Sequence, residues 1–149
     1  MSIFARLLPL LLALVLAAPL VAQTPLQDVL QANRAEVANP SRASVGQVLA
    51  ALREADAPGT SEFLRQWQDR MVVEDPATGL FHVSLEVEGR QLALIDLDSG
   101  AEIGRVSSRD VIPIRPNAGV RREIGAALVR FELSAPDPSR RLAALEAIA

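Results

Sequence analysis

The sequence predicts an α+β fold in which short helices at both ends of the chain flank a small antiparallel β-meander. Apolar residues recur every three or four positions in residues 23–71 and again in residues 113–149, and between these segments they alternate one by one. The first spacing places apolar side chains on one face of a helix, and the second places them on one face of a strand. We therefore expect a helical region at 23–71, a strand insert at 72–112 and a helical hairpin at 113–149.

The residues before these segments, 1–22, have the pattern of a signal peptide. Arg6 precedes an apolar run at residues 7–18, and we expect cleavage after Ala22. The alternative is an uncleaved membrane anchor, because residues 3–22 approach the roughly 20 apolar residues that a spanning helix needs. Both interpretations predict that the rest of the chain lies on the extracytoplasmic side.

Three short helices are predicted in residues 23–71. The first begins at Thr24 and is broken by Pro40, and the second opens at Ser41 and ends before Gly59. The third begins at Thr60 or Ser61. Tight turns between helices of this length allow them to pack against one another.

Three strands are predicted in the insert, at residues 80–88, 91–96 and 102–106. In the first, alternation places Phe81 and Leu85 on the apolar face and His82 on the opposite, solvent-exposed face. Gly89 and Gly100 mark the two turns. Three short strands are marginal in water on their own, so a helix is expected to cover their apolar face.

The helical hairpin begins at Asn117. Apolar residues follow at spacings of four, four and three: Val120, Ile124, Leu128 and Phe131. After a break at residues 134–138, a second helix carries apolar residues on one face: Leu142, Leu145 and Ile148. Such helix pairs resemble units of HEAT-like repeats, in which each pair buries its apolar face on the next. The helices at both ends are therefore predicted to be short HEAT-like helices.

Composition excludes several functional classes. The formal net charge is −3, and the 15 basic residues are all arginine and are scattered along the chain, which argues against nucleic acid as a partner. Half of the residues are hydrophobic, enough for one domain with a core. The absence of cysteine excludes disulfides, thiolate nucleophiles and most structural zinc sites.

No residue pattern indicates catalysis, so we expect a protein that is not an enzyme and uses no cofactor. His82 is the only histidine and cannot build a conventional structural zinc site alone. The acidic residues from Asp96 onward, around Gly100, have the wrong spacing for a calcium loop and favour a hairpin turn. Glu86 and Glu88 share a strand face without a second catalytic group. No catalytic, cofactor-binding or metal-binding residue is assigned.

The carboxyl-terminal third resembles a known family. It is similar to the amino-terminal extracytoplasmic region of the permease subunit of bacterial urea ABC transporters, which are of the branched-chain amino acid permease type. The residues that carry the resemblance are Ile114, Asn117, Arg121, Arg122, Leu128, Ser134, Pro136, Asp137, Arg140, Leu142 and Ala143. Residues 97–104 are similar to the strand insert of that family.

The resemblance implies a role in urea uptake at the periplasmic face of the bacterial inner membrane, or in the soluble periplasm if the chain is complete. It also implies other subunits of the transporter as partners: a second permease, ATP-binding subunits and a periplasmic urea-binding protein. One departure is large, because no apolar span of roughly 20 residues follows Ala22. The chain is therefore expected to lack the membrane-spanning permease part and to be a fragment of the whole subunit. The alternatives are that the last helix closes a self-contained domain, and that the protein is an independent periplasmic HEAT-like interaction module.

Overall fold

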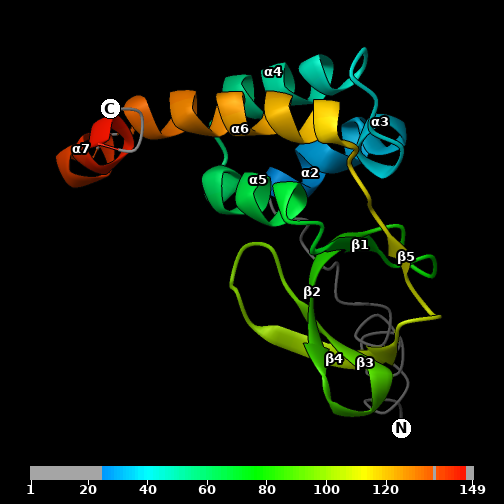
Figure 1. Ribbon diagram of the computed structural model, residues 1–149. Helices are drawn as coiled ribbons and strands as arrows, with labels where there is room; N and C mark the ends of the chain where they lie inside the picture. The colour runs from blue at the N-terminus through cyan, green and yellow to red at the C-terminus, as the bar shows by residue number, and fades with distance from the viewer. Residues whose placement is uncertain (1–24, 136, 147–149) are drawn as a thin grey trace, which may run out of the picture.

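The computed structural model describes residues 25–135 and 137–146, which form a layer of helices beside a curled antiparallel sheet (Figure 1). The first helices are α2 (Pro25–Ala32), α3 (Arg34–Ala38), α4 (Val45–Ala55) and α5 (Thr60–Gln68). The strands are β1 (Val72–Glu74), β2 (Phe81–Val87), β3 (Gln91–Ile95), β4 (Glu102–Ser107) and β5 (Ile112–Pro113). Helices α6 (Ala118–Leu133) and α7 (Pro138–Glu146) follow. The predicted α+β class, with helices at both ends of a small antiparallel sheet, is confirmed.

One apolar core holds the helices together. Leu30 of α2, Leu52 of α4, Trp67 of α5 and Ile124 of α6 are fully buried in it. The rings of Phe63 and Trp67 stack with their centroids 5.5 Å apart. Because burial of each large apolar side chain contributes about 1.5–3 kcal/mol, this shared core is the main stabilising feature of the layer.

The predicted first helix is divided in the structure. Asn33 separates α2 from α3, and its side-chain amide donates to the carbonyl of Val29 over 2.9 Å. A side chain that bonds to the backbone in this way competes with the regular helical pattern. The second helix begins at Val45 rather than at Ser41, and α5 begins at Thr60 as predicted.

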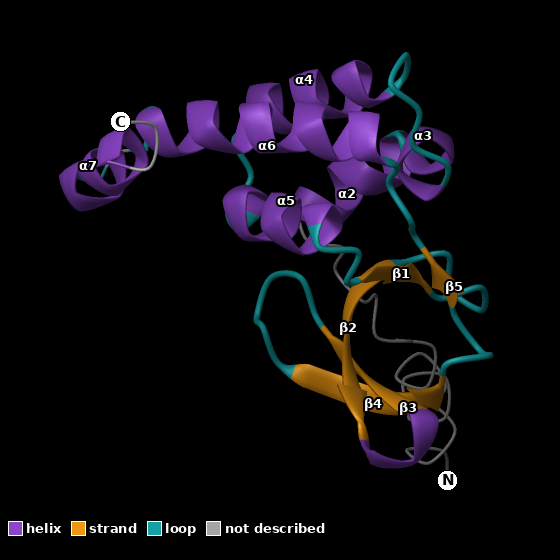
Figure 2. Ribbon diagram, in the orientation of Figure 1, coloured by secondary structure: helices purple, strands orange, loops and turns teal. Residues whose placement is uncertain are grey.

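The sheet has five strands in the order β4-β3-β2-β1-β5, and all neighbours are antiparallel (Figure 2). The three predicted strands correspond to β2, β3 and β4. The prediction missed β1 and β5, which pair Val73 with Pro113 and Glu74 with Ile112. The strand before the meander and the strand after it therefore lie side by side.

The prediction that His82 is exposed on a polar strand face is wrong. His82 is only 6% exposed, whereas Leu85, predicted to be buried, is 42% exposed. Both faces of β2 are covered at its start, because Phe81 belongs to the helical core and His82 lies opposite Val73, which belongs to a second apolar cluster. This second cluster comprises Val73, Leu94 and Val111, with Leu92 and Val106 packed against it.

Helix α2 is attached to β2 by a side chain that continues the strand ladder. The Gln27 amide donates to the Phe81 carbonyl over 2.9 Å, and its oxygen accepts from the Phe81 N–H over 3.2 Å. The pairing of β3 with β2 extends only to Val83 opposite Ile95, so β3 does not reach Phe81. Gln27 therefore satisfies two backbone groups of a fully buried residue.

A second attachment joins α3 to β1. The Arg34 guanidinium is hydrogen-bonded to the Glu74 carboxylate through Nε, at 3.1 Å, and through a terminal nitrogen. The Glu74 side chain is 6% exposed and that of Arg34 is 51% exposed. The ion pair therefore compensates a buried carboxylate with a cation that still reaches solvent.

Helix α6 returns from the sheet to the helical layer. Asn117 caps it, because its side-chain oxygen accepts the N–H of Val120 over 3.0 Å. The Gln68 amide donates to the Arg121 carbonyl over 3.2 Å and so links α5 to α6. None of the helices formed by residues 25–135 and 137–146 has both the length and the apolar character needed to cross a membrane.

Candidate functional site

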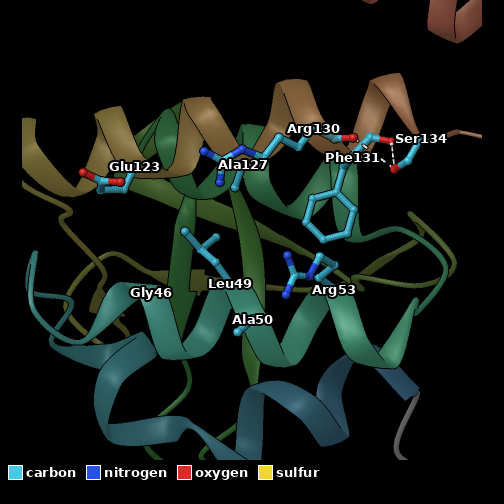
Figure 3. Close-up of a pocket in the computed structure, with 9 residues that line it drawn as sticks. All are labelled: Gly46, Leu49, Ala50, Arg53, Glu123, Ala127, Arg130, Phe131 and Ser134. Atoms are coloured by element: carbon cyan, nitrogen blue, oxygen red, sulfur yellow. Dashed lines mark hydrogen bonds between the residues drawn. The ribbon is translucent and has the colours of Figure 1, made fainter.

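The strongest candidate site is a groove between α4 and α6, with a volume of about 320 Å³. The two helices lie side by side and run in the same direction, so that their carboxyl-terminal ends meet at one end of the groove (Figures 1 and 3). The groove residues are Gly46, Leu49, Ala50 and Arg53 from α4 and Glu123, Ala127, Arg130 and Phe131 from α6, followed by Ser134. We call this hollow the α4–α6 groove.

The floor of the α4–α6 groove is apolar. Leu49 and Phe131 point into the space between the helices (Figure 3) and pack against the helical core while remaining partly exposed. Ala127 is 7% exposed. At Gly46 an added Cβ would meet no atom within 4 Å, so the groove is open above α4.

The charges of the α4–α6 groove are divided between its ends. Arg53 and Arg130 lie in the last turns of α4 and α6, and both are exposed. Among residues 25–135 and 137–146, no carboxylate forms an ion pair with either guanidinium. At the other end, Oε1 of Glu123 lies 3.7 Å from Nε of Arg42. The groove therefore offers two cations beside an apolar floor.

A second candidate surface is the outer face of α7. Leu142 is 58% exposed and Leu145 is 53% exposed, whereas Ala144 is 6% exposed. An alanine of the helix is thus buried while its two leucines face solvent, the reverse of the usual arrangement in a surface helix. The third predicted residue of this face, Ile148, lies outside the described residues, as does the predicted signal peptide at 1–22.

His82 occupies an unusual environment but does not lie in either candidate surface. Its Nδ1 is buried and has no hydrogen-bond partner among the described residues. Burial lowers the pKa of His82 below its ordinary value of 6.5, and the attraction of Asp75 and Asp96 opposes this only in part. A buried neutral imidazole next to Val73 is part of the core of the sheet.

The acidic loop around Gly100 forms the turn between β3 and β4. The Asp96 carboxylate accepts from the backbone N–H groups of Asp98, at 3.2 Å, and Ser99, at 2.8 Å. The Ser99 hydroxyl also donates to it, at 2.7 Å. These bonds, those from Ser99 foremost, hold the pKa of Asp96 below its usual value. The carboxylate is thus used to order the turn. Within the described part of the chain, no three acidic or histidine side chains are placed to bind a metal ion together.

Sequence analysis did not identify Arg53 and Arg130 as site residues. They are 77 positions apart in the chain, and only the parallel packing of α4 against α6 brings them to one groove. Comparisons of the chain with protein-family models, curated proteins and solved structures found no match.

Proposed function

We propose that this chain is the extracytoplasmic amino-terminal part of the permease subunit of a urea ABC transporter. It acts in urea uptake as a helical interaction module at the periplasmic face of the inner membrane. Its partners are a second permease, ATP-binding subunits and a periplasmic urea-binding protein. It carries out no chemical reaction and needs no cofactor.

The proposal rests on one observation: the residues of the resemblance have distinct tasks in one continuous unit around α6. Ile114 is fully buried where the chain leaves the sheet, and Asn117 caps the helix. Leu128 packs against the helical core. Ser134 ends α6, where its hydroxyl donates to the Arg130 carbonyl over 3.0 Å. A pattern of capping and packing residues in this order is more specific than the alanine and leucine content that many helices share.

The exposed leucines of α7 support the same proposal. Leu142 belongs to the resemblance, and together with Leu145 it presents apolar side chains to solvent. In helical repeats such a face is covered by the next helix pair. We therefore expect the outer face of α7 to contact another segment of the transporter.

Urea uptake tests the proposal directly. The coding sequence for residues 25–146 is deleted in the native bacterium while residues 1–24 and any downstream sequence stay in frame, and uptake of radiolabelled urea is measured. We expect urea uptake to fall while uptake of a branched-chain amino acid is unchanged. Normal urea uptake after the deletion would exclude the proposal.

Crosslinking separates this proposal from the second candidate function, an independent periplasmic interaction module, which is favoured by the presence of a groove complete within the described chain. A photoreactive residue is placed at Leu142, and its products are identified by mass spectrometry. Crosslinks to transporter subunits support the permease proposal, whereas crosslinks only to unrelated periplasmic proteins support the independent module. A matched probe at Arg109, which is exposed in the loop between β4 and β5, shows the background of random contacts.

Amino-terminal sequencing tests the location. Material from the extracytoplasmic fraction is expected to begin at Gln23, because cleavage is predicted after Ala22. Intact Met1 in a cytoplasmic pool would contradict export.

A further inference from the structure

We propose that the α4–α6 groove binds a small amphipathic anion, with Arg53 and Arg130 holding its anionic head group and Leu49, Ala127 and Phe131 contacting a short apolar chain. This inference does not depend on the proposed function. It follows from the charges, the floor and the size of the groove.

The charges favour a monoanion. Each helix carboxyl terminus carries roughly half a negative charge, so the ends of α4 and α6 together offset about one of the two positive charges of Arg53 and Arg130. About one positive charge remains. Glu123 is at the opposite end of the groove and is already near Arg42. A single carboxylate at the arginine end therefore matches the remaining charge, whereas a phosphate monoester, with a charge of about −1.5 to −2 at neutral pH, exceeds it. Guanidinium groups bind both kinds of head group in a bidentate manner.

The floor and the size favour an apolar chain of limited length. Leu49, Ala127 and Phe131 line the groove that the two arginines also line (Figure 3). The volume of about 320 Å³ is near the lower limit of ordinary ligand sites, which is roughly 300 Å³. A six-carbon chain with one head group is a suitable probe.

Binding is tested by NMR titration of the labelled chain with hexanoate, hexan-1-ol and hexylamine. We expect hexanoate to shift the amide signals of Gly46 and Ala127 with a midpoint at least tenfold lower than that of hexan-1-ol, and hexylamine to bind most weakly. A titration with hexyl phosphate distinguishes the two head groups: tighter binding than hexanoate assigns the site to phosphate esters, and weaker binding assigns it to carboxylates. Equal midpoints for hexanoate and hexan-1-ol would overturn the proposal.

Three variants locate the binding site. Arg53→Gln and Arg130→Gln are each expected to weaken hexanoate binding about three- to tenfold, because each removes one charge-assisted contact. Arg122→Gln is the matched control, since it makes the same charge change on the exposed surface of α6 outside the groove. An equal effect of all three variants would show that only net charge matters and would refute the site.

Gly46→Leu supplies a test that does not change charge. The added side chain meets no atom near its Cβ, and leucine is a better helix former than glycine, so the variant is expected to fold. It fills the groove and is expected to weaken binding of both hexanoate and hexan-1-ol. Unchanged hexanoate binding by Gly46→Leu would place the ligand elsewhere and overturn the proposal.

Discussion

The hydrogen bonds between Gln27 and Phe81 provide the sharpest test of how the helices hold the sheet. Gln27→Leu keeps a side chain of similar size but removes both bonds, so that the buried N–H and carbonyl of Phe81 lose their partner. Each buried backbone group left without a partner costs about 1–3 kcal/mol. Leucine returns about 1 kcal/mol through burial of apolar surface. The two groups together cost about 2–6 kcal/mol, so we expect the free energy of unfolding to fall by about 1–5 kcal/mol.

The assay is guanidinium unfolding followed by circular dichroism at neutral pH. Gln31→Leu is the control, because Gln31 lies one turn further along α2 and its part-buried amide donates to the Gly79 carbonyl over 2.8 Å and, more weakly, to Gln27 Oε1 over 3.3 Å. This control is expected to lose less than about 1 kcal/mol. If Gln27→Leu lost no more stability than Gln31→Leu, the argument that Gln27 continues the strand ladder would be refuted.

Three further predictions concern the ion pair, the histidine and the outer face of α7. Arg34→Met leaves the Glu74 carboxylate buried without its cation and is expected to reduce the free energy of unfolding by about 2 kcal/mol. This loss is smaller than for a fully buried pair because Arg34 is half exposed. The double variant Arg34→Met/Glu74→Met should regain most of the lost stability in the same unfolding assay. His82 has a lowered pKa in the folded state, so below pH 6.5 the unfolded state binds more protons and stability should fall as the pH is lowered from 7.5 to 5.5. His82→Leu should reduce this loss, and an unchanged pH dependence of unfolding would show that His82 is not its source. The exposed side chains of Leu142 and Leu145 should favour self-association of the chain, measured by light scattering. The double variant Leu142→Ser/Leu145→Ser should decrease this association and change stability by less than about 0.5 kcal/mol, because both side chains are exposed; equal association of the variant and the unaltered chain would exclude this face as its cause.

The parts of the fold that the sequence predicted best are those with long periodic patterns and clear caps. Helix α6 begins after Asn117 as expected, and its apolar spacing places Val120 and Ile124 in the core. The strands β2, β3 and β4 follow from alternation and from turns at glycine. These signals are local, so the sequence carries them directly.

The parts that could not be predicted depend on contacts between distant segments. The strands β1 and β5 have only three and two residues, too few for a periodic signal. They form because β1 pairs with β2 and β5 pairs with β1. Alternation predicts an exposed His82 because it assumes that one face of the strand is in contact with solvent. At the start of β2 both faces are covered, so His82 is buried. Prediction of the α4–α6 groove likewise requires the knowledge that α4 and α6 pack side by side and run in the same direction.

The pairing of β1 with β5 has a consequence for how the module is built. The chain leaves the helical layer after α5 and returns to it before α6, and the points of departure and return are neighbouring strands. Since Gln68 of α5 is hydrogen-bonded to the Arg121 carbonyl of α6, the two helices remain adjacent across the insert. The sheet is thus an insert whose two ends are adjacent, and only its inner part, β1 and the start of β2, is attached to the helices through Gln27 and Arg34. Lengthening the outer strands β3 and β4 would mainly add to the entropy of closing a loop, which grows slowly with the number of residues. A relative could enlarge or shorten these outer strands while keeping the order of its helices and the surfaces that they present.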